Sequence, residues 1–326
     1  MRRRDFITLL GSTAATWPLA ARAQQPGLPV IGYLSPSTPG ERAGNLQDFR
    51  KGLSEMGYVE GRNVAIEFRW AQNDARRLPE LAADLVRRRV AVIAAAGGNA
   101  AGAAKAIPIV FGTAFDPVEA GLVASLNRPG GNLTGVVSLV DEIERKQLGL
   151  LHELLPRATR FAVLWNGRPA RPDTYIRDYI PNLQAAAQSI GVEVEFQKAN
   201  TNTEIDATFA DLVQKRTDGL VVESLLFFRD RRAQILTLAA RHAIPVISGA
   251  RADAEAGGLM SYGANATDIP RQNGIYVGRV LKGEKPADLP IMRATRFEFL
   301  INLQTAKTLG IEVPPTLLAL ADEVIE

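Results

Sequence analysis

The chain contains the same strand–helix passage twice. The string Ala-Asp-Leu-Val occurs at 83–86 and again at 210–213, and each copy leads through an arginine into a short apolar run. Downstream, Ala-Ile-Pro-Ile-Val at 106–110 is matched by Ala-Ile-Pro-Val-Ile at 243–247, and an alternating strand pattern precedes both copies. Short strand–helix units can converge on similar strings, but three matches in one order indicate a duplication. We therefore predict two similar α/β lobes with a cleft between them.

Strand and helix patterns alternate through both halves of the chain. Such alternation predicts parallel sheets covered by helices on both faces, so the expected fold class is two doubly wound parallel-sheet lobes. We place lobe 1 at 24–138 plus 259–290 and lobe 2 at 139–258 plus 291–326. The chain then passes between the lobes three times, which predicts a three-segment hinge.

The first 23 residues have the pattern of an export signal. Arg2, Arg3 and Arg4 form a twin-arginine type of start, an apolar stretch follows, and the segment ends in a small-x-small site at Ala23. The stretch is too short and too polar to span a membrane, and Pro18 would break a first helix of the fold. We expect residues 1–23 to be a twin-arginine signal peptide, cleaved near Ala23, and the protein to work in the periplasm.

Charge and cysteine content exclude several classes of protein. The chain has 38 basic and 35 acidic residues, and removing the signal with its four arginines and one aspartate leaves 34 of each. A neutral chain offers no basic footprint for nucleic acid. The absence of cysteine excludes disulfides, thiolate metal sites and a lipid-anchored cysteine. We expect a monomer that requires no cofactor and no metal.

Ligands of open parallel sheets bind beyond the carboxyl ends of the strands, which nominates the residues of a site. In lobe 1 these candidates are Ser35, Ser37, Thr38, Gly98, Asn99, Thr113, Phe115 and Asp116. In lobe 2 they are Asn166, Glu223, Phe227, Ser248 and Tyr262. Hydroxyls and backbone N–H groups can hold a ligand carboxylate, Asp116 or Glu223 can hold an amine or a hydroxyl, and the rings can line a pocket. The alternative is that the same residues cap helices, form turns or pack in the core.

The inventory of catalytic motifs is thin. The chain has two histidines, His152 and His242, and neither a zinc-protease motif nor a nucleophile elbow. These observations favour a binding protein over an enzyme. Two other classes stay open, namely a secreted hydrolase-like α/β enzyme with Asp116 or Glu223 as its base and a ligand-sensing module of a signalling receptor.

Several longer strings resemble one known family. The strings at 57–63, 121–132 and 258–263 are similar to those of the substrate-binding proteins of ABC transporters, a large family whose better-known relatives take up aromatic amino acids. The resemblance implies a type I periplasmic-binding fold, a small-molecule ligand such as an amino acid or related carboxylate, and transient contact with a permease in the inner membrane. Two departures lie at predicted ligand-facing loops. Leu225-Leu226 stands where relatives commonly carry Asp-Pro, and the segment between Gly98 and Ile107 is a few residues shorter.

Overall fold

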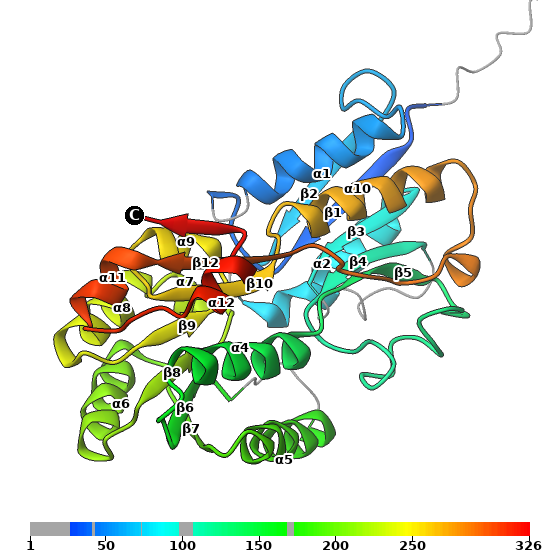
Figure 1. Ribbon diagram of the computed structural model, residues 1–326. Helices are drawn as coiled ribbons and strands as arrows, with labels where there is room; N and C mark the ends of the chain where they lie inside the picture. The colour runs from blue at the N-terminus through cyan, green and yellow to red at the C-terminus, as the bar shows by residue number, and fades with distance from the viewer. Residues whose placement is uncertain (1–26, 41–42, 73, 98–106, 168–172) are drawn as a thin grey trace, which may run out of the picture.

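The computed structural model describes residues 27–40, 43–72, 74–97, 107–167 and 173–326, which form two α/β lobes (Figure 1). The predicted signal, residues 1–23, lies outside these ranges. Within them, no helix has the length and apolar character needed to cross a membrane. The two-lobed parallel-sheet class predicted from the duplication is confirmed.

Lobe 1 is built on a parallel sheet with the strand order β11-β5-β4-β3-β1-β2. Its strands are β1 (Val30–Ser35), β2 (Ala65–Trp70), β3 (Val92–Ala96), β4 (Ile109–Thr113), β5 (Leu133–Val137) and β11 (Met292–Arg293). Its helical segments are α1 (Ala43–Glu55), η2 (Ala75–Arg77), α2 (Leu78–Arg87), α10 (Asp268–Leu281) and η3 (Pro286–Asp288). Strand residues alternate between two buried clusters, so α2 covers one face of the sheet while α1 and α10, side by side, cover the other (Figure 1).

Lobe 2 is built on a larger sheet with the strand order β13-β12-β10-β9-β8-β6-β7. Its strands are β6 (Arg160–Trp165), β7 (Glu193–Lys198), β8 (Gly219–Val222), β9 (Val246–Ser248), β10 (Met260–Ala264), β12 (Phe297–Asn302) and β13 (Glu323–Ile325). Its helices are α4 (Val140–Leu154), α5 (Asp173–Ser189), α6 (Asn202–Gln214), α7 (Leu226–Arg229), α8 (Arg232–His242), α9 (Arg251–Glu255), α11 (Leu303–Thr308) and α12 (Pro315–Leu320). All neighbouring strands run parallel except β10 and β12. The cluster under α4 and α5 lies on one face, and the cluster under α6 and α8 lies on the other.

The duplication extends to individual contacts. In each half the first strand lies between the second and the third, as β1 does between β2 and β3 and β6 does between β7 and β8. The aspartate of each Ala-Asp-Leu-Val string accepts a hydrogen bond from the neighbouring edge strand. Arg69 Nη2 donates to Asp84 Oδ2 at 2.6 Å, and Gln197 Nε2 donates to Asp211 Oδ2 at 2.8 Å. The repeated string therefore fastens a helix to an edge strand in both lobes.

Two strands, β10 and β11, pair in the lobe opposite to the one predicted for their segments. Residues 259–290 were assigned to lobe 1, but β10 pairs with β9 in lobe 2, with Ser261 opposite Ser248. Residues 291–326 were assigned to lobe 2, but β11 pairs with β5 in lobe 1. The reason is that β10 completes the lobe-2 sheet before the chain crosses, so the crossing comes after Ala264. The last crossing follows β11.

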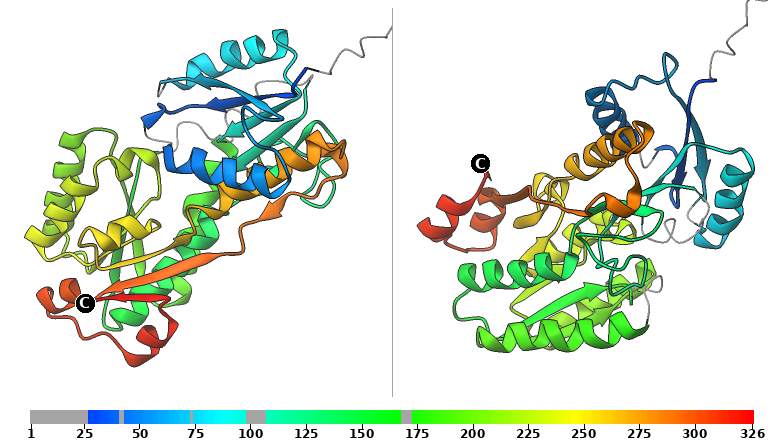
Figure 2. Two further views of the ribbon diagram at one scale, coloured as in Figure 1. Left: turned by 90° about the horizontal axis from the view of Figure 1, so that it is seen from above. Right: turned by 90° about the vertical axis from the view of Figure 1, so that its right-hand side faces the viewer.

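The three crossing segments meet in a hydrogen-bonded hinge. One segment follows β5, one joins β10 to α10, and one joins β11 to β12. The Ala294 N–H donates to the Val137 carbonyl at 2.7 Å, and the Asn265 N–H donates to the Arg296 carbonyl at 2.9 Å. Figure 2 shows the orange segment with β11 and β12 running from one lobe to the other. The three-segment hinge predicted from the sequence is confirmed.

Candidate ligand-binding site

The strand ends of lobe 1 carry buried hydroxyls. Ser35 closes β1 and is fully buried, and its Oγ accepts a hydrogen bond from the Ser37 N–H at 3.3 Å. Ser37 is also fully buried, and Thr38 follows it with partial exposure. Thr113 closes β4 and is 5% exposed, and its Oγ1 has no hydrogen-bond partner in the part of the chain that the structure describes. Buried polar atoms are rarely left unpaired in native proteins, so Thr113 marks a place where a ligand atom would be favourable. Gly98 and Asn99 lie outside the described residues.

The loop after β4 carries two candidates, Asp116 and Phe115, and they have different roles. Asp116 Oδ1 accepts hydrogen bonds from the backbone N–H groups of Val118 at 2.7 Å and Glu119 at 3.3 Å, so this carboxylate stabilises a turn. Phe115 reaches across the boundary between the lobes and packs against the hydrophobic core of lobe 2, which Tyr262 also contacts. The loop thus brings an aromatic ring of lobe 1 onto lobe 2.

Among the lobe-2 candidates, Glu223 and Asn166 contact each other, whereas Ser248 and Phe227 lie on the other face of the sheet. Glu223 directly follows β8 and is 1% exposed, and its Oε2 accepts a hydrogen bond from the Asn166 N–H at 3.3 Å. Ser248 closes β9, and its buried Oγ has no hydrogen-bond partner within the described ranges. Its register with Val222 places it on the sheet face that α8 covers. Phe227 packs on that same face, under the Arg231 guanidinium, which lies 3.8 Å from the ring centre.

Helix α4 adds two buried polar residues that the sequence analysis missed. Glu144 is 1% exposed and Gln147 is fully buried. The Tyr179 hydroxyl donates to Glu144 Oε2 at 2.5 Å, and Gln147 Nε2 donates to the Tyr262 carbonyl at 2.8 Å. The signal that could have found them is a glutamate and a glutamine on the inward stripe of a helix whose other inward residues are apolar, since a buried polar residue is the informative exception.

Trp165 adds an indole to the same region. It closes β6 and is 8% exposed, and its Nε1 has no hydrogen-bond partner among the described residues. Its ring centre lies 6.4 Å from that of Tyr179 and 5.5 Å from that of Phe196. Tyr262 stacks on Phe297 with 5.8 Å between ring centres, and burial raises the pKa of its hydroxyl. Aromatic rings with few, fixed polar groups are typical of small-molecule sites.

These side chains form one group around the strand ends of lobe 2. The space beside Gly249 is filled by the Ser224 hydroxyl and by Gln147 Nε2, which lies 3.4 Å from the place a Cβ would take. Gln147 therefore lies near the loop that carries Glu223. We call this group the lobe-2 cluster; its members are Glu144, Gln147, Trp165, Tyr179, Glu223 and Tyr262. It combines two buried carboxylates, a fixed amide and an indole N–H, a set suited to binding a polar organic molecule.

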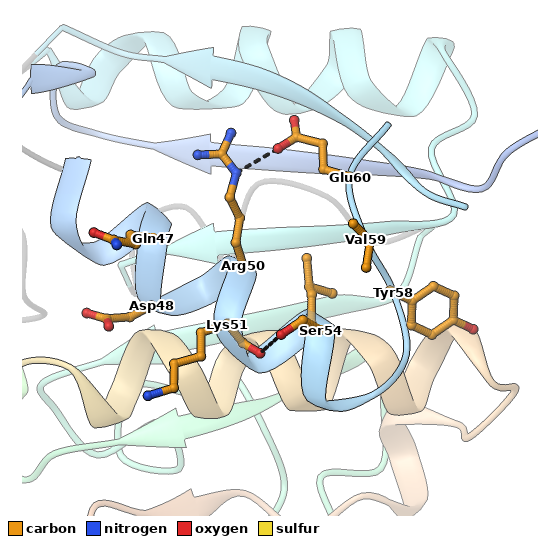
Figure 3. A pocket seen from close by; sticks show the side chains of 9 residues that line it. Gln47, Asp48, Arg50, Lys51, Ser54, Tyr58, Val59 and Glu60 are labelled. Atoms are coloured by element: carbon orange, nitrogen blue, oxygen red, sulfur yellow. Dashed lines mark hydrogen bonds and ion pairs between the residues drawn. The ribbon is translucent and has the colours of Figure 1, made fainter. Parts of the chain in front are cut away.

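A hollow lies along α1 on the outside of lobe 1 (Figure 3). Its walls come from α1 and the loop at 58–60, and the Arg50–Glu60 ion pair crosses it at 2.6 Å. None of the predicted site residues that the structure describes lines it. Among the described residues, no group of histidines and carboxylates is arranged to hold a metal ion.

Two parallel-sheet lobes with polar groups at the strand ends define a type I periplasmic-binding fold. Residues 39–325 match the family model of the ABC transporter substrate binding proteins, and the chain belongs to this family.

Three relatives place the chain more closely. A tyrosine-binding protein of Clostridioides difficile (strain R20291) is 30% identical over 274 residues, covering 81% of this chain and 76% of the relative. A domain from Streptococcus pneumonia, solved in complex with L-Trp, has 26% identity and a TM-score of 0.79, over 91% of this chain and 99% of that one. A ligand-free, open substrate-binding protein with adhesive properties from Clostridium difficile has 26% identity over the same shares of the two chains and a TM-score of 0.68.

Proposed function

We propose that the protein is the periplasmic binding component of an ABC importer, closing its lobes on an amino acid with an aromatic side chain. The observation that carries the proposal is the lobe-2 cluster, where Gln147 Oε1 on α4 and Trp165 Nε1 at the end of β6 are buried without hydrogen-bond partners among the described residues. Two relatives support the class of ligand, one described as tyrosine-binding and one solved with L-Trp. The export signal expected at residues 1–23 supports a location in the periplasm.

The two lobes hold different ends of this ligand. The carboxylate lies against lobe 1, because Ser35, Ser37 and Thr113 bring hydroxyls to the strand ends there. The ammonium group meets Glu223, whose buried carboxylate can compensate a positive charge. Asp116 is the weaker candidate, since its carboxylate accepts hydrogen bonds from Val118 and Glu119 that stabilise its own turn. The aromatic side chain packs among Phe115 and the rings of lobe 2.

The relative placement of the lobes is consistent with a closed state. At equal identity and coverage, the TM-score is 0.79 with the L-Trp complex and 0.68 with the ligand-free, open relative. Phe115 of lobe 1 already packs against lobe 2. Both observations support an arrangement in which the strand ends of the two lobes enclose the ligand.

A thermal-shift screen of residues 24–326 against the natural amino acids tests the binding step. A cognate ligand at about 100 times its Kd stabilises the folded state by about 2.7 kcal/mol. For a chain of this size we expect the melting temperature to rise by roughly 5–10 °C. Loss of the screened amino acid from solution over time would instead indicate the hydrolase-like alternative.

Calorimetry then tests the role of Glu223. Glu223→Ala should weaken binding of the cognate amino acid at least about tenfold, because it removes a buried charged partner of the ammonium group. Glu193→Ala is the matched control, since Glu193 is an exposed carboxylate on β7 of the same lobe. Equal affinities of the two variants would exclude the role of Glu223.

Uptake measurements test delivery to the permease. Cells that lack the protein should take up less of the labelled cognate amino acid, and the wild-type gene should restore uptake. Normal uptake combined with loss of a response to that amino acid would favour the sensing alternative.

A further inference from the structure

Gln147 has a side chain whose orientation is set by its neighbours. The Tyr262 carbonyl can only accept a hydrogen bond, so the amide nitrogen of Gln147, 2.8 Å away, must face it. The amide oxygen Oε1 then points elsewhere, and it is buried without a partner among the described residues. An unpaired buried acceptor costs free energy, and a donor supplied by the ligand would remove that cost. The structure thus contains a fixed acceptor ready for a ligand N–H or O–H.

The surroundings of this acceptor indicate which part of a ligand reaches it. Gln147 is fully buried in α4, next to the hydrophobic core of lobe 2 that includes the rings of Trp165 and Tyr179. It is a neutral amide, whereas Glu144 and Glu223 in the same cluster are the groups suited to a cation. In the proposed function the ligand carboxylate lies on lobe 1 and the ammonium group meets Glu223, so the side chain is the part left to extend further into lobe 2. A neutral donor on an aromatic ring fits this place.

We propose that Gln147 is a specificity-determining residue that accepts a hydrogen bond from a ring donor of the ligand, either a phenol O–H or an indole N–H. The inference rests on the proposed function and narrows it, since phenylalanine has the shape of tyrosine but no such donor. The unpartnered indole N–H of Trp165 lies in the same cluster, and a phenol oxygen can accept from it while donating to Gln147. A site built around such a donor discriminates strongly against the analogue that lacks it.

The test measures the Kd values of L-tyrosine, L-tryptophan and L-phenylalanine by calorimetry for the wild-type protein, Gln147→Leu and Gln234→Leu. Gln234 is the matched control, because it also has a buried, unpartnered Oε1 and donates to a backbone carbonyl, that of Asn202, but lies on α8 away from the cluster. Wild type should bind tyrosine or tryptophan at least tenfold more tightly than phenylalanine. Gln147→Leu should remove this preference while leaving the affinity for phenylalanine within threefold, and Gln234→Leu should retain it.

Several results would overturn the role of Gln147. Wild-type binding of phenylalanine as tight as that of both other amino acids would do so without any variant, even if Gln147→Leu failed to fold. An equal loss for all three ligands in Gln147→Leu would indicate a structural role or a bond to the ammonium group, and unchanged affinities would indicate no contact. Wild-type protein that binds none of the three would instead refute the proposed ligand class.

Discussion

The close approach of α1 and α10 gives a quantitative prediction about stability. A Cβ built on Gly52 of α1 would lie 1.9 Å from the Arg271 carbonyl oxygen of α10, and one on Gly274 would lie 2.2 Å from the Phe49 carbonyl oxygen. Both obstacles are backbone atoms, which no rotamer change can remove. Restoring an ordinary contact of 3.4 Å at Gly52 would require the helices to separate by about 1.5 Å, which a close-packed interior resists.

The expected effect of Gly52→Ala is a balance of two terms. Replacing a helical glycine by alanine stabilises by about 1 kcal/mol, and overpacking a buried contact usually costs 1–3 kcal/mol, occasionally more. Since the overlap here is with backbone, we expect a net loss of about 2 kcal/mol, which lowers the melting temperature by roughly 4–8 °C. Urea unfolding monitored by circular dichroism would measure the free energy directly.

Gly44→Ala is the control, because Gly44 lies in the same helix and a Cβ there would meet nothing within 4 Å. It should leave stability unchanged or raise it by up to about 1 kcal/mol. If Gly52→Ala is as stable as Gly44→Ala, the close helix contact is wrong and the glycine has no packing role.

Three further substitutions test other contacts. Thr201→Ala removes the capping-box hydroxyl of α6 and should cost about 1 kcal/mol in urea unfolding; no loss would exclude the cap. Tyr179→Phe removes the donor to buried Glu144 and should cost about 1–3 kcal/mol by the same assay; a loss below about 0.5 kcal/mol would show that the bond contributes little. The hydrogen-bonded Arg271 guanidinium lowers the pKa of Glu55 below its usual 4.5, so this stabilisation is present above that pH and is lost as pH falls through the lowered pKa. Glu55→Gln should therefore lose less stability on acidification in thermal unfolding, and equal acid profiles would contradict the pairing.

Local patterns predicted most elements because their information lies within a few residues. The apolar runs at 246–248 and 297–302 form the strands β9 and β12, and the apolar stripe at 275–281 lies within helix α10. Local patterns did not predict which lobe β10 and β11 would join. The residues of β10 look alike whichever sheet they join, and only pairing with β9 decides the matter.

The candidate site was predictable to a lesser degree. The strand-end rule found Glu223 and Tyr262, which the structure brings into one cluster. It could not find Glu144 or Gln147, because they lie on helix α4 and not at the end of a strand. It also nominated Phe227, whose packing face depends on the short helix α7. Side chains that reach a site from a covering helix are determined by tertiary packing, which no strand pattern encodes.

The triple hinge has a consequence for the energetics of binding. Because three chain segments join the lobes and hydrogen-bond to one another, the second lobe never diffuses away from a ligand held by the first. Contact with the second lobe is then an intramolecular event with a high effective concentration, and most of the translational and rotational entropy cost of a three-body encounter is absent. Two half-sites that are each weak can therefore together bind a small molecule with few polar groups tightly. Lengthening any one of the three segments should weaken binding without changing a ligand contact.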